Sequence, residues 1–261
     1  MNQVNIGIVV PTLGTRPNYL LETLKSIRNA GACHILIVTP DPSLIHQSVD
    51  QAYFDDVIKD PNLGLPEAIN AGIHALPDDI QYINWLGDDD LLEPKSLSRI
   101  SEYLSESPRS VFVYGKCKYI GRDGEFLLVN HSGPFAKLLM RFGPQLIPQP
   151  GSLIRRFAFE QVGGLNSKYK WAFDLDLLIK LSKVGRLSYF PHLVASFRWH
   201  DQSLSVGGRE GSVREASEIR VKSLPVPLRA FSSIWEIPIR FFILKAGSIL
   251  SIRSKKLRLR K

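Results

Sequence analysis

The stretch YINWLGDDD, from Tyr82 to Asp90, joins an apolar run to three adjacent carboxylates. The apolar part predicts a short strand, and the acidic part lies where that strand ends. Because side chains alternate along an extended chain, we expect Asp88 and Asp90 to point the same way and Asp89 to point elsewhere. Carboxylates this close repel one another unless a cation lies between them. Such oxygen ligands suit Mg²⁺ or Mn²⁺, which could in turn hold a nucleotide diphosphate.

A simpler interpretation of the same residues is a solvated acidic turn. The following Leu91–Pro94 looks like the entry to a helix, and carboxylates are common at that position. Both interpretations stay open at this point.

Alternating strands and helices surround this stretch. Apolar runs over 6–10 and 34–38 predict buried strands, and the helical spacing of leucines and isoleucines over 19–30 predicts a helix between them. This is a βαβ unit, so the sheet should be parallel with a right-handed crossover. The alternation continues and predicts an α/β sandwich. Its further elements are helices over 66–76, 94–105 and 173–184, strands over 80–86 and 111–114, and a hairpin over 117–129.

Polar residues follow several of these predicted strands. Thr12, Asp41 and Asp88–Asp90 each come after an apolar run. In α/β sheets, ligands bind beyond the carboxyl ends of the strands. We therefore expect three loops to converge on one crevice.

Composition places few limits on this chain of 261 residues. A hydrophobic content of 44% with 22% charged residues is typical of a globular protein with a substantial core, either one large domain or a domain with an extension. Two cysteines, Cys33 and Cys117, form neither a disulfide framework nor a metal cluster, which favours a reducing compartment. The first five residues lack the basic segment of a signal peptide, so none is expected.

The net charge of +8 is concentrated at the C-terminal end. Residues 209–261 hold 13 Lys and Arg against 4 Asp and Glu, a balance of +9, which leaves −1 for the rest of the chain. This distribution argues against a nucleic-acid surface over the whole body and favours a local contact with something anionic.

An ordered set of motifs resembles the family 2 glycosyltransferases, inverting enzymes of the GT-A fold, over about residues 4–206. The motifs are VVPT at Val9–Thr12, DPNLGLPEAINAGI at Asp60–Ile73, WLGDDD at Trp85–Asp90, GGL at Gly163–Leu165 and FDLDL at Phe173–Leu177. The resemblance implies a Rossmann-like three-layer sandwich with a mixed, mostly parallel sheet. Residues 1–206 would form the catalytic domain, and 207–261 a basic amphipathic helical extension.

The resemblance also assigns a donor site. Pro11, Thr12 and Asp41 would lie against the base and ribose of a UDP-, dTDP- or GDP-sugar, and Asn62, Gly64 and Asn70 would shape the nucleotide pocket. The acidic triplet corresponds to the DXD motif, in which Asp88 and Asp89 face the donor and a Mn²⁺ or Mg²⁺ ion bridges both phosphates. Gly87 replaces the first acid of the usual motif, which leaves open which of the three aspartates holds the metal; Asp90 is favoured, followed by Asp88.

Two downstream residues complete the implied site. Asp174 matches the catalytic base, which takes the proton from an acceptor hydroxyl as that oxygen attacks the anomeric carbon, although Phe173 replaces the usual glutamate before it. The alternative for Asp174 is an ordinary acid at a helix N-terminus. His200 matches a histidine that reaches the metal or the diphosphate, and its alternative is a loop histidine bonded to Asp201 or Ser203. Arg198 is a further candidate for a phosphate contact.

Few residues of the sequence can be related to binding of the acceptor. Pro150–Ser152 and Trp171 lie where relatives contact the acceptor, although Trp171 also fits plain core packing. The Gln-x-x-Arg-Trp signature of processive polysaccharide synthases is missing after residue 200, which favours transfer of a single sugar.

The apolar stretch 231–252 is about long enough to span a bilayer, but Glu236, Arg240 and Lys245 interrupt it. This pattern favours a helix lying on an anionic membrane, with packing onto the catalytic domain as the alternative. The resulting hypothesis is a cytoplasmic, peripheral enzyme at the inner face of the plasma membrane. It would add a sugar to a lipid-linked surface glycan and would not bind nucleic acid. The rivals are a sugar-phosphate nucleotidyltransferase, weakly suggested by Pro11–Pro17, and a non-catalytic assembly partner on a membrane.

Overall fold

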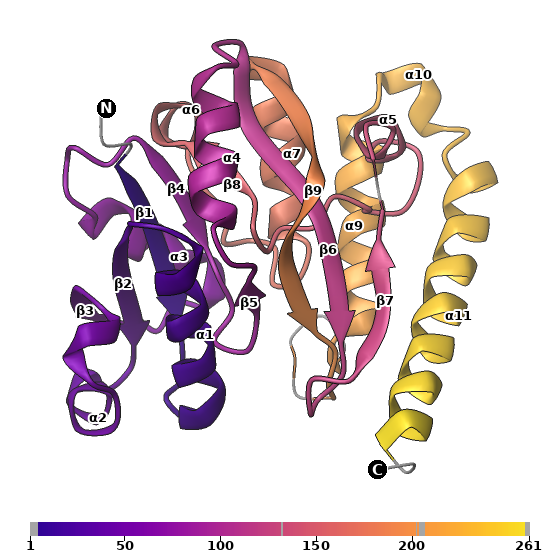
Figure 1. Cartoon of the computed structure of the whole chain (residues 1–261). Helices are drawn as coiled ribbons and strands as arrows, with labels where there is room; N and C mark the ends of the chain where they lie inside the picture. The colour runs from indigo at the N-terminus through magenta and orange to yellow at the C-terminus, as the bar shows by residue number, and fades with distance from the viewer. Residues whose placement is uncertain (1–4, 132, 202, 204–206, 259–261) are drawn as a thin grey trace.

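A computed structural model describes residues 5–131, 133–201, 203 and 207–258 of the chain (Figure 1). Residues 1–4, Leu204 and Ser205 of the predicted histidine loop, and Arg260 and Lys261 of the basic end lie outside the described residues.

The described strands form one mixed sheet, which confirms the predicted α/β class. Its order is β3–β2–β1–β4–β8–β6–β9–β5, and β7 pairs with β6. β3, β2, β1 and β4 are mutually parallel, and β6 is parallel to β9. β8 is antiparallel to both β4 and β6 and so joins the two parallel parts. The strands are β1 (Ile6–Pro11), β2 (His34–Thr39), β3 (Asp56–Lys59), β4 (Tyr82–Trp85), β5 (Leu91–Leu92), β6 (Ser110–Ile120), β7 (Phe126–Asn130), β8 (Leu153–Arg155) and β9 (Arg186–Arg198).

Helices cover both faces of the sheet and give three layers (Figure 1). Along β1, Val9 belongs to one hydrophobic cluster while Ile8 and Val10 belong to the other, as the twofold side-chain period requires. The face with Ile8 packs on α1 (Pro17–Ala30) and α4 (Ser96–Ser105). The opposite face packs on α3 (Leu65–Ala75), α6 (Arg156–Gln161), α7 (Phe173–Val184) and α9 (Arg209–Ser223). Shorter helices are α2 (Pro42–Ser48), η1 (Gln51–Tyr53), α5 (Ala136–Leu139) and α10 (Val226–Arg229).

The helix entry expected at Leu91–Pro94 is wrong. Leu91 and Leu92 form strand β5, which pairs with β9, and α4 begins only at Ser96. A sequence of two leucines contains no periodicity, so only the partner strand decides that this segment is extended.

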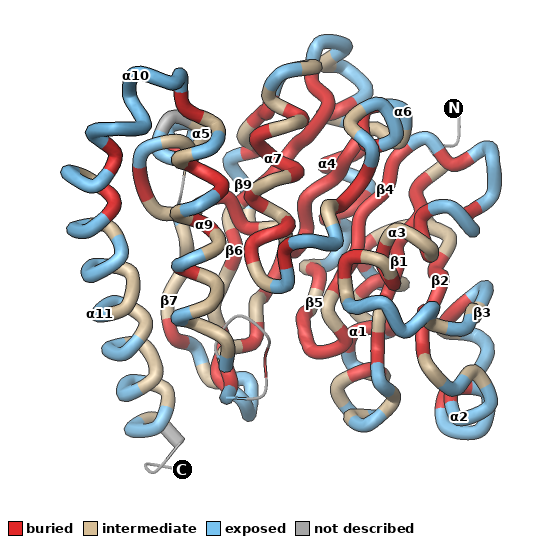
Figure 2. Tube along the Cα trace, turned by 180° about the vertical axis from the view of Figure 1, so that it is seen from behind, coloured by how far each residue is buried: buried red, intermediate tan, exposed pale blue. Residues whose placement is uncertain are grey.

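The last described helix, α11 (Ser233–Arg258), lies at the edge of the molecule and packs against α9 and β7 (Figure 1). Figure 2 shows burial concentrated along the strands and α7, whereas α11 is mostly exposed or intermediate. A buried ion pair between Arg220 of α9 and Glu236 of α11, at 2.6 Å, joins the two helices. Among the described helices, none combines the length and hydropathy needed to cross a bilayer.

Candidate active site

The three aspartates lie in a tight turn directly after β4. The backbone N–H of Asp90 donates to the carbonyl oxygen of Gly87 at 3.2 Å, so the chain is no longer extended here. Each of the aspartates is less than one-tenth exposed. Asp88 and Asp89 both face the Arg16 side chain, while Asp90 faces the backbone of β9. The expected pairing of Asp88 with Asp90 on one side is therefore wrong, because alternation ends where the strand turns.

The loop after β1 supplies the partners of Asp88. Thr12 Oγ1 donates to Asp88 Oδ2 at 2.6 Å, and Arg16 Nη2 forms an ion pair with Asp88. Burial raises the pKa of Asp88, and the hydrogen bond from Thr12 and the charge of Arg16 oppose that rise only in part.

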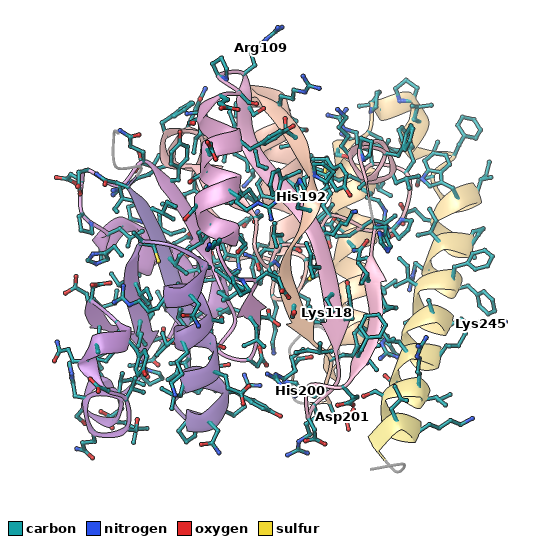
Figure 3. The ribbon with its side chains drawn as sticks, viewed as in Figure 1. Arg109, Lys118, His192, His200, Asp201 and Lys245 are labelled. Carbon is teal, nitrogen blue, oxygen red and sulfur yellow. The ribbon has the colours of Figure 1, made fainter. Side chains whose placement is uncertain are left out.

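Asp89 contacts two nitrogen groups. Its Oδ2 lies 2.6 Å from Arg16 Nη1 and 2.7 Å from His200 Nε2, and the two nitrogens lie 3.1 Å apart. Burial alone would raise the pKa of Asp89, but the hydrogen bond from His200 and the charge of Arg16 outweigh it and lower that pKa. The imidazole of His200 thus reaches the acidic turn, while Ser203 bonds only the backbone carbonyl of His200, at 2.9 Å. Figure 3 places His200 and Asp201 beyond the end of β9.

Asp90 is held by β9. Its Oδ1 accepts from the backbone N–H of Arg198 at 2.9 Å, and its carbonyl oxygen accepts from Thr23 Oγ1 at 2.8 Å. Burial raises the pKa of Asp90 well above its ordinary value, and the charge of Asp89 adds to that rise. Arg198 is itself 3% exposed and donates from Nε to the carbonyl of Asp89 at 2.9 Å and from Nη2 to Glu22 at 2.7 Å. Arg198 therefore supports the turn, and its guanidinium is already occupied.

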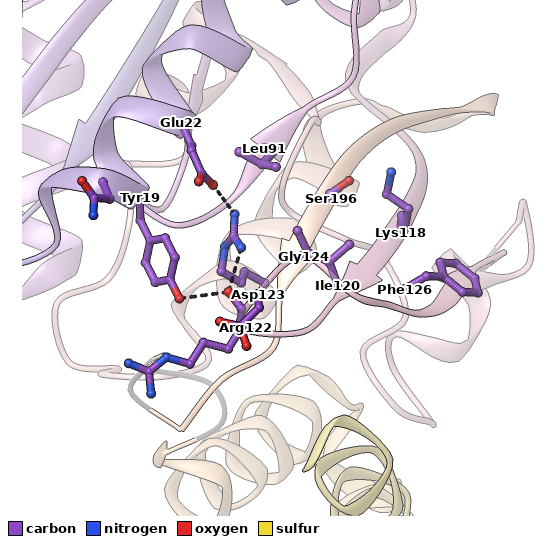
Figure 4. Close-up of a pocket in the computed structure, with 12 residues that line it drawn as sticks. Tyr19, Glu22, Leu91, Lys118, Ile120, Arg122, Asp123, Gly124, Phe126 and Ser196 are labelled. Atoms are coloured by element: carbon purple, nitrogen blue, oxygen red, sulfur yellow. Dashed lines mark hydrogen bonds and ion pairs between the residues drawn. The ribbon is translucent and has the colours of Figure 1, made fainter. Parts of the chain in front are cut away.

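A cavity of about 520 Å³ lies on the far side of Arg198 (Figure 4). Tyr19 and Glu22 of α1 line it from one side, and Lys118 and Ile120 of β6 line it from another. Arg198 stacks over the Tyr19 ring at 4.5 Å, so the same side chain forms a wall of this cavity and a support of the acidic turn.

The donor set of the turn fits a divalent cation. Within the described part of the chain, no three His, Cys, Asp or Glu side chains already converge as ligands, and the predicted metal ligands Asp88, Asp90 and His200 face separate partners. However, the carboxylates of Asp88 and Asp89 hold a guanidinium between them, which shows that the turn accommodates a cation. Hard carboxylate oxygens with one imidazole are ligands that Mn²⁺ and Mg²⁺ accept.

Asp174 lies in the first turn of α7, close to the end of β4. The ring of Phe173 packs on that of Trp85 at 6.2 Å between centroids, which brings the start of α7 beside the strand that leads to the aspartates. Asp174 Oδ1 accepts from the backbone N–H of Leu175 at 2.8 Å, and burial raises the pKa of Asp174 despite this bond.

The hydroxyl of Tyr119 of β6 is influenced by the charges of both acidic regions. Burial raises the pKa of its hydroxyl, and the negative charges of both Asp90 and Asp174 raise it further. Tyr119 is therefore within electrostatic reach of the turn and of the predicted base. Its ring packs on Phe197 of β9 at 5.3 Å, which fixes its position.

The residues predicted to bind the nucleotide lie at neighbouring strand ends. Pro11 ends β1, and exposed Asp41 caps α2 by accepting from the backbone N–H of Ser43 at 3.0 Å. Hydrogen bonds from Ser43 lower the pKa of Asp41. Asn62 and Gly64 adopt left-handed backbone angles, with φ of 59° and 98°, in the loop before α3. These values suit asparagine and glycine, so the loop conformation itself explains both residues.

Asn70 has a different role from the one predicted. Its Nδ2 donates to the carbonyl of Leu165 and its Oδ1 accepts from the N–H of Leu165, both at 2.9 Å. The amide thus holds the turn at Gly163–Leu165, far along the chain, and Asn70 links two of the motifs.

The side chain of Trp171 packs against α9. A Cβ added at Gly208 or Gly211 would lie 2.0 Å or 2.5 Å from its ring, so these glycines allow the helix to approach it closely. Glu215 of α9 accepts from the backbone N–H groups of Lys170, Trp171 and Ala172 at 2.8–3.0 Å, directly before α7. Sequence reasoning missed Arg16 and Glu215 as site residues, and only their long-range contacts identify them.

Residues 7–163 match the model of the glycosyl transferase family 2, which is more than half of the chain. A chondroitin synthase of Pasteurella multocida is 24% identical over 152 residues, which cover 58% of this chain and 15% of that protein. An uncharacterized glycosyltransferase of Rickettsia typhi is 25% identical over 214 residues, which cover 75% of this chain and 64% of that protein. The chain thus spans less than two thirds of the length of either relative.

Solved structures share the fold. The mannosyltransferase PcManGT from Pyrobaculum calidifontis, in complex with GDP-Man and Mn²⁺, aligns with a TM-score of 0.64 at 15% identity over 97% of this chain and 80% of that chain. Residues 1–349 of TarS from S. aureus align with a TM-score of 0.62 at 14% identity over 91% of this chain and 72% of that chain. These similarities confirm the predicted GT-A fold.

Proposed function

The chain belongs to glycosyl transferase family 2, and on this basis we propose that it transfers a single sugar from a nucleotide-sugar donor to a glycan acceptor with inversion at the anomeric carbon. The observation that carries this proposal is the buried acidic turn at the end of β4, together with a half-buried carboxylate, Asp174, on a helix that begins beside that strand. A cluster of buried carboxylates needs a cation, and a nucleotide diphosphate provides a reason for one to be there.

Asp88 and Asp90 would hold Mn²⁺ or Mg²⁺, with His200 as a third ligand. Mn²⁺ is present in the complexes of PcManGT with GDP-Man and of GalNAc-T7 with UDP and GalNAc. When bound, such an ion would supply positive charge that stabilises the departing diphosphate. Thr12 would keep Asp88 oriented through its 2.6 Å hydrogen bond.

Asp174 would act as the general base. Its carboxylate takes the proton from the acceptor hydroxyl while that oxygen attacks the anomeric carbon opposite the departing diphosphate, which inverts the configuration. The raised pKa of Asp174 makes its carboxylate a stronger base than a solvated aspartate. The acceptor would approach along the start of α7, where Asp174 is partly accessible.

The two rival functions fit the molecule less well. A sugar-phosphate nucleotidyltransferase would use the loop after β1 to contact phosphates, whereas Arg16 of that loop binds carboxylates here. A non-catalytic assembly partner would have no need to bury three aspartates beside a base with a raised pKa.

We also propose that α11 places the enzyme on an anionic membrane, where a lipid-linked acceptor would be found. Its inward face is fixed by Glu236 and by Ser251 Oγ, which accepts from Trp199 Nε1 at 3.2 Å and Arg209 Nη2 at 3.0 Å. The opposite face is apolar yet exposed, and cations lie along it, as expected for a helix lying in a membrane interface. Its exposed residues include Ile234, Ile237, Phe241, Phe242, Ile249 and Ile252, with Lys245, Arg253 and Lys256.

The test is thermal stability in the presence of UDP, GDP or dTDP, each with and without Mn²⁺. We expect one nucleotide to raise the melting temperature by several degrees when Mn²⁺ is present and to leave it unchanged when Mn²⁺ is absent. Asp90→Asn should lose this shift, while Asp201→Asn, an exposed neighbour of His200, should retain it. A chain that responds to no nucleotide would contradict the donor site and favour the assembly partner.

A further inference from the structure

The acidic turn already contains a cation, the guanidinium of Arg16. Its Nη2 pairs with Asp88, and its Nη1 lies 2.6 Å from Asp89 Oδ2 and 3.1 Å from His200 Nε2. One side chain thus contacts three of the side chains assigned to the metal–diphosphate site. Guanidinium is planar and presents several donors, so it can span two carboxylates at once.

The position of Arg16 allows it to leave without disturbing the fold. The backbone of Arg16 caps α1, where its carbonyl oxygen accepts from the Leu20 N–H at 3.0 Å, while its side chain takes no part in the helix and is 25% exposed against 6% for that of Asp88. The backbone of the loop is anchored independently, because Thr12 N donates to the carbonyl of Val38 at 2.9 Å. A change of side-chain rotamer would therefore move the guanidinium toward solvent.

We propose that Arg16 is a resident cation that neutralises the turn in the free protein and that the divalent metal must displace. This inference rests on the proposed metal site and goes beyond it. Without Arg16, the two buried carboxylates would keep only their hydrogen bonds with Thr12 and His200 and would lose the guanidinium charge between them, which is costly. With Arg16 in place, a metal ion gains its ligands only after an existing ion pair is broken. Arg16 therefore stabilises the free protein and weakens its affinity for the metal.

The experiment titrates the full chain with Mn²⁺ in the absence of nucleotide. Electron paramagnetic resonance measures the concentration of free Mn²⁺, and the bound fraction gives the dissociation constant. Arg16→Gln should bind Mn²⁺ at least about tenfold more tightly than the unaltered protein, because no ion pair has to be broken. Arg16→Lys, which keeps one charge but cannot span two carboxylates, should fall between them. Arg122→Gln removes an equal charge from an exposed arginine nearby and should leave Mn²⁺ affinity unchanged.

Melting temperature provides a second readout that needs no donor. Arg16→Gln should melt at a lower temperature than the unaltered protein in chelator, and Mn²⁺ should raise its melting temperature more than that of the unaltered protein. If Arg16→Gln does not fold, the Arg16→Lys titration decides the inference by the same comparison.

The outcomes separate this inference from the proposed function. Equal Mn²⁺ affinity in the Arg16 variants and the unaltered protein, with binding abolished by Asp90→Asn, would overturn the role of Arg16 and leave the metal site standing. Weaker affinity in Arg16→Gln would also overturn it, because Arg16 would then assist the metal. No Mn²⁺ binding in any variant would overturn both proposals.

Discussion

Asp88, Asp89 and Asp90 are chemically identical and adjacent, yet their environments differ. Burial raises the pKa of Asp88 and Asp90, whereas His200 and Arg16 lower that of Asp89. The difference follows from which partners each side chain meets where the chain turns. Asp88 and Asp89 each have two side-chain partners, whereas the charge of Asp90 is stabilised mainly by the hydrogen bond from the backbone N–H of Arg198.

At Asp174 we expect the transfer rate to depend on pH. Burial raises the pKa of its carboxyl, and the base must be deprotonated to accept a proton. The rate should therefore increase as the pH rises through the pKa of Asp174, which lies above the usual aspartate value of about 3.9. Asp174→Asn should lose at least about 100-fold in kcat.

The control for this prediction is Asp176→Asn. Asp176 lies in the same helical turn but pairs with Lys180 at 2.8 Å, so its replacement should change kcat little. The measurement is the pH profile of kcat with the donor found by thermal shift. Equal losses in the two variants would indicate a general effect on α7, and the base assignment would fail.

At the scale of elements, α9 and α7 are joined at the start of the helix that carries Asp174. Glu215 accepts hydrogen bonds from the three backbone N–H groups immediately before α7. The bonds from Trp171 and Ala172 are partly buried, and a buried donor left without an acceptor costs about 1–3 kcal/mol. We expect Glu215→Ala to lower the free energy of unfolding by about that amount in a urea titration, and to reduce kcat because Asp174 is less firmly positioned.

Glu218→Ala is the matched control, one turn further along α9. Glu218 is exposed and pairs with Lys168 at 3.5 Å and with Lys222, both at the surface, so its removal should change the free energy of unfolding far less than that of Glu215. Equal effects of the two replacements would mean that the contacts of Glu215 do not hold α7 in place.

The elements with strong patterns could be predicted from sequence, and the others could not. The helix over 173–184 has an apolar period and coincides with α7, and the apolar runs 6–10 and 34–38 lie within β1 and β2. β5 and β8 have two and three residues, too few for any period to appear. The same limit applies to the site. Thr12 and the aspartates follow strands that sequence can identify, but the partners of Arg16 lie 72 to 184 residues away in the chain.

The exposed apolar face of α11 predicts that the protein binds lipid. Vesicles with anionic lipid should retain the protein, neutral vesicles should retain it less, and added salt should weaken the binding. Replacing Phe241 and Phe242 together by serine should reduce partitioning by at least about tenfold, because each buried phenylalanine contributes about 1.5–3 kcal/mol. Sedimentation with vesicles measures both effects.

The control is Leu63→Ser, since Leu63 is also highly exposed but lies in the loop before α3. Its replacement should leave partitioning unchanged. Equal loss in both proteins, or equal retention on neutral and anionic vesicles, would contradict a membrane role for α11 and leave it as a packing helix.

Because Asp90 is held by β9, the acidic turn cannot be completed until β9 has been synthesised. On the ribosome, the aspartates emerge about 110 residues before Arg198 and His200, the groups that later bind them. Until then, among the residues that the structure describes, Thr12 and Arg16 are the side chains that can already pair with these carboxylates. The site is therefore completed late in synthesis. A nascent chain that ends near residue 163, where the family match ends, would carry most of the sheet and lack the strand that supports Asp90.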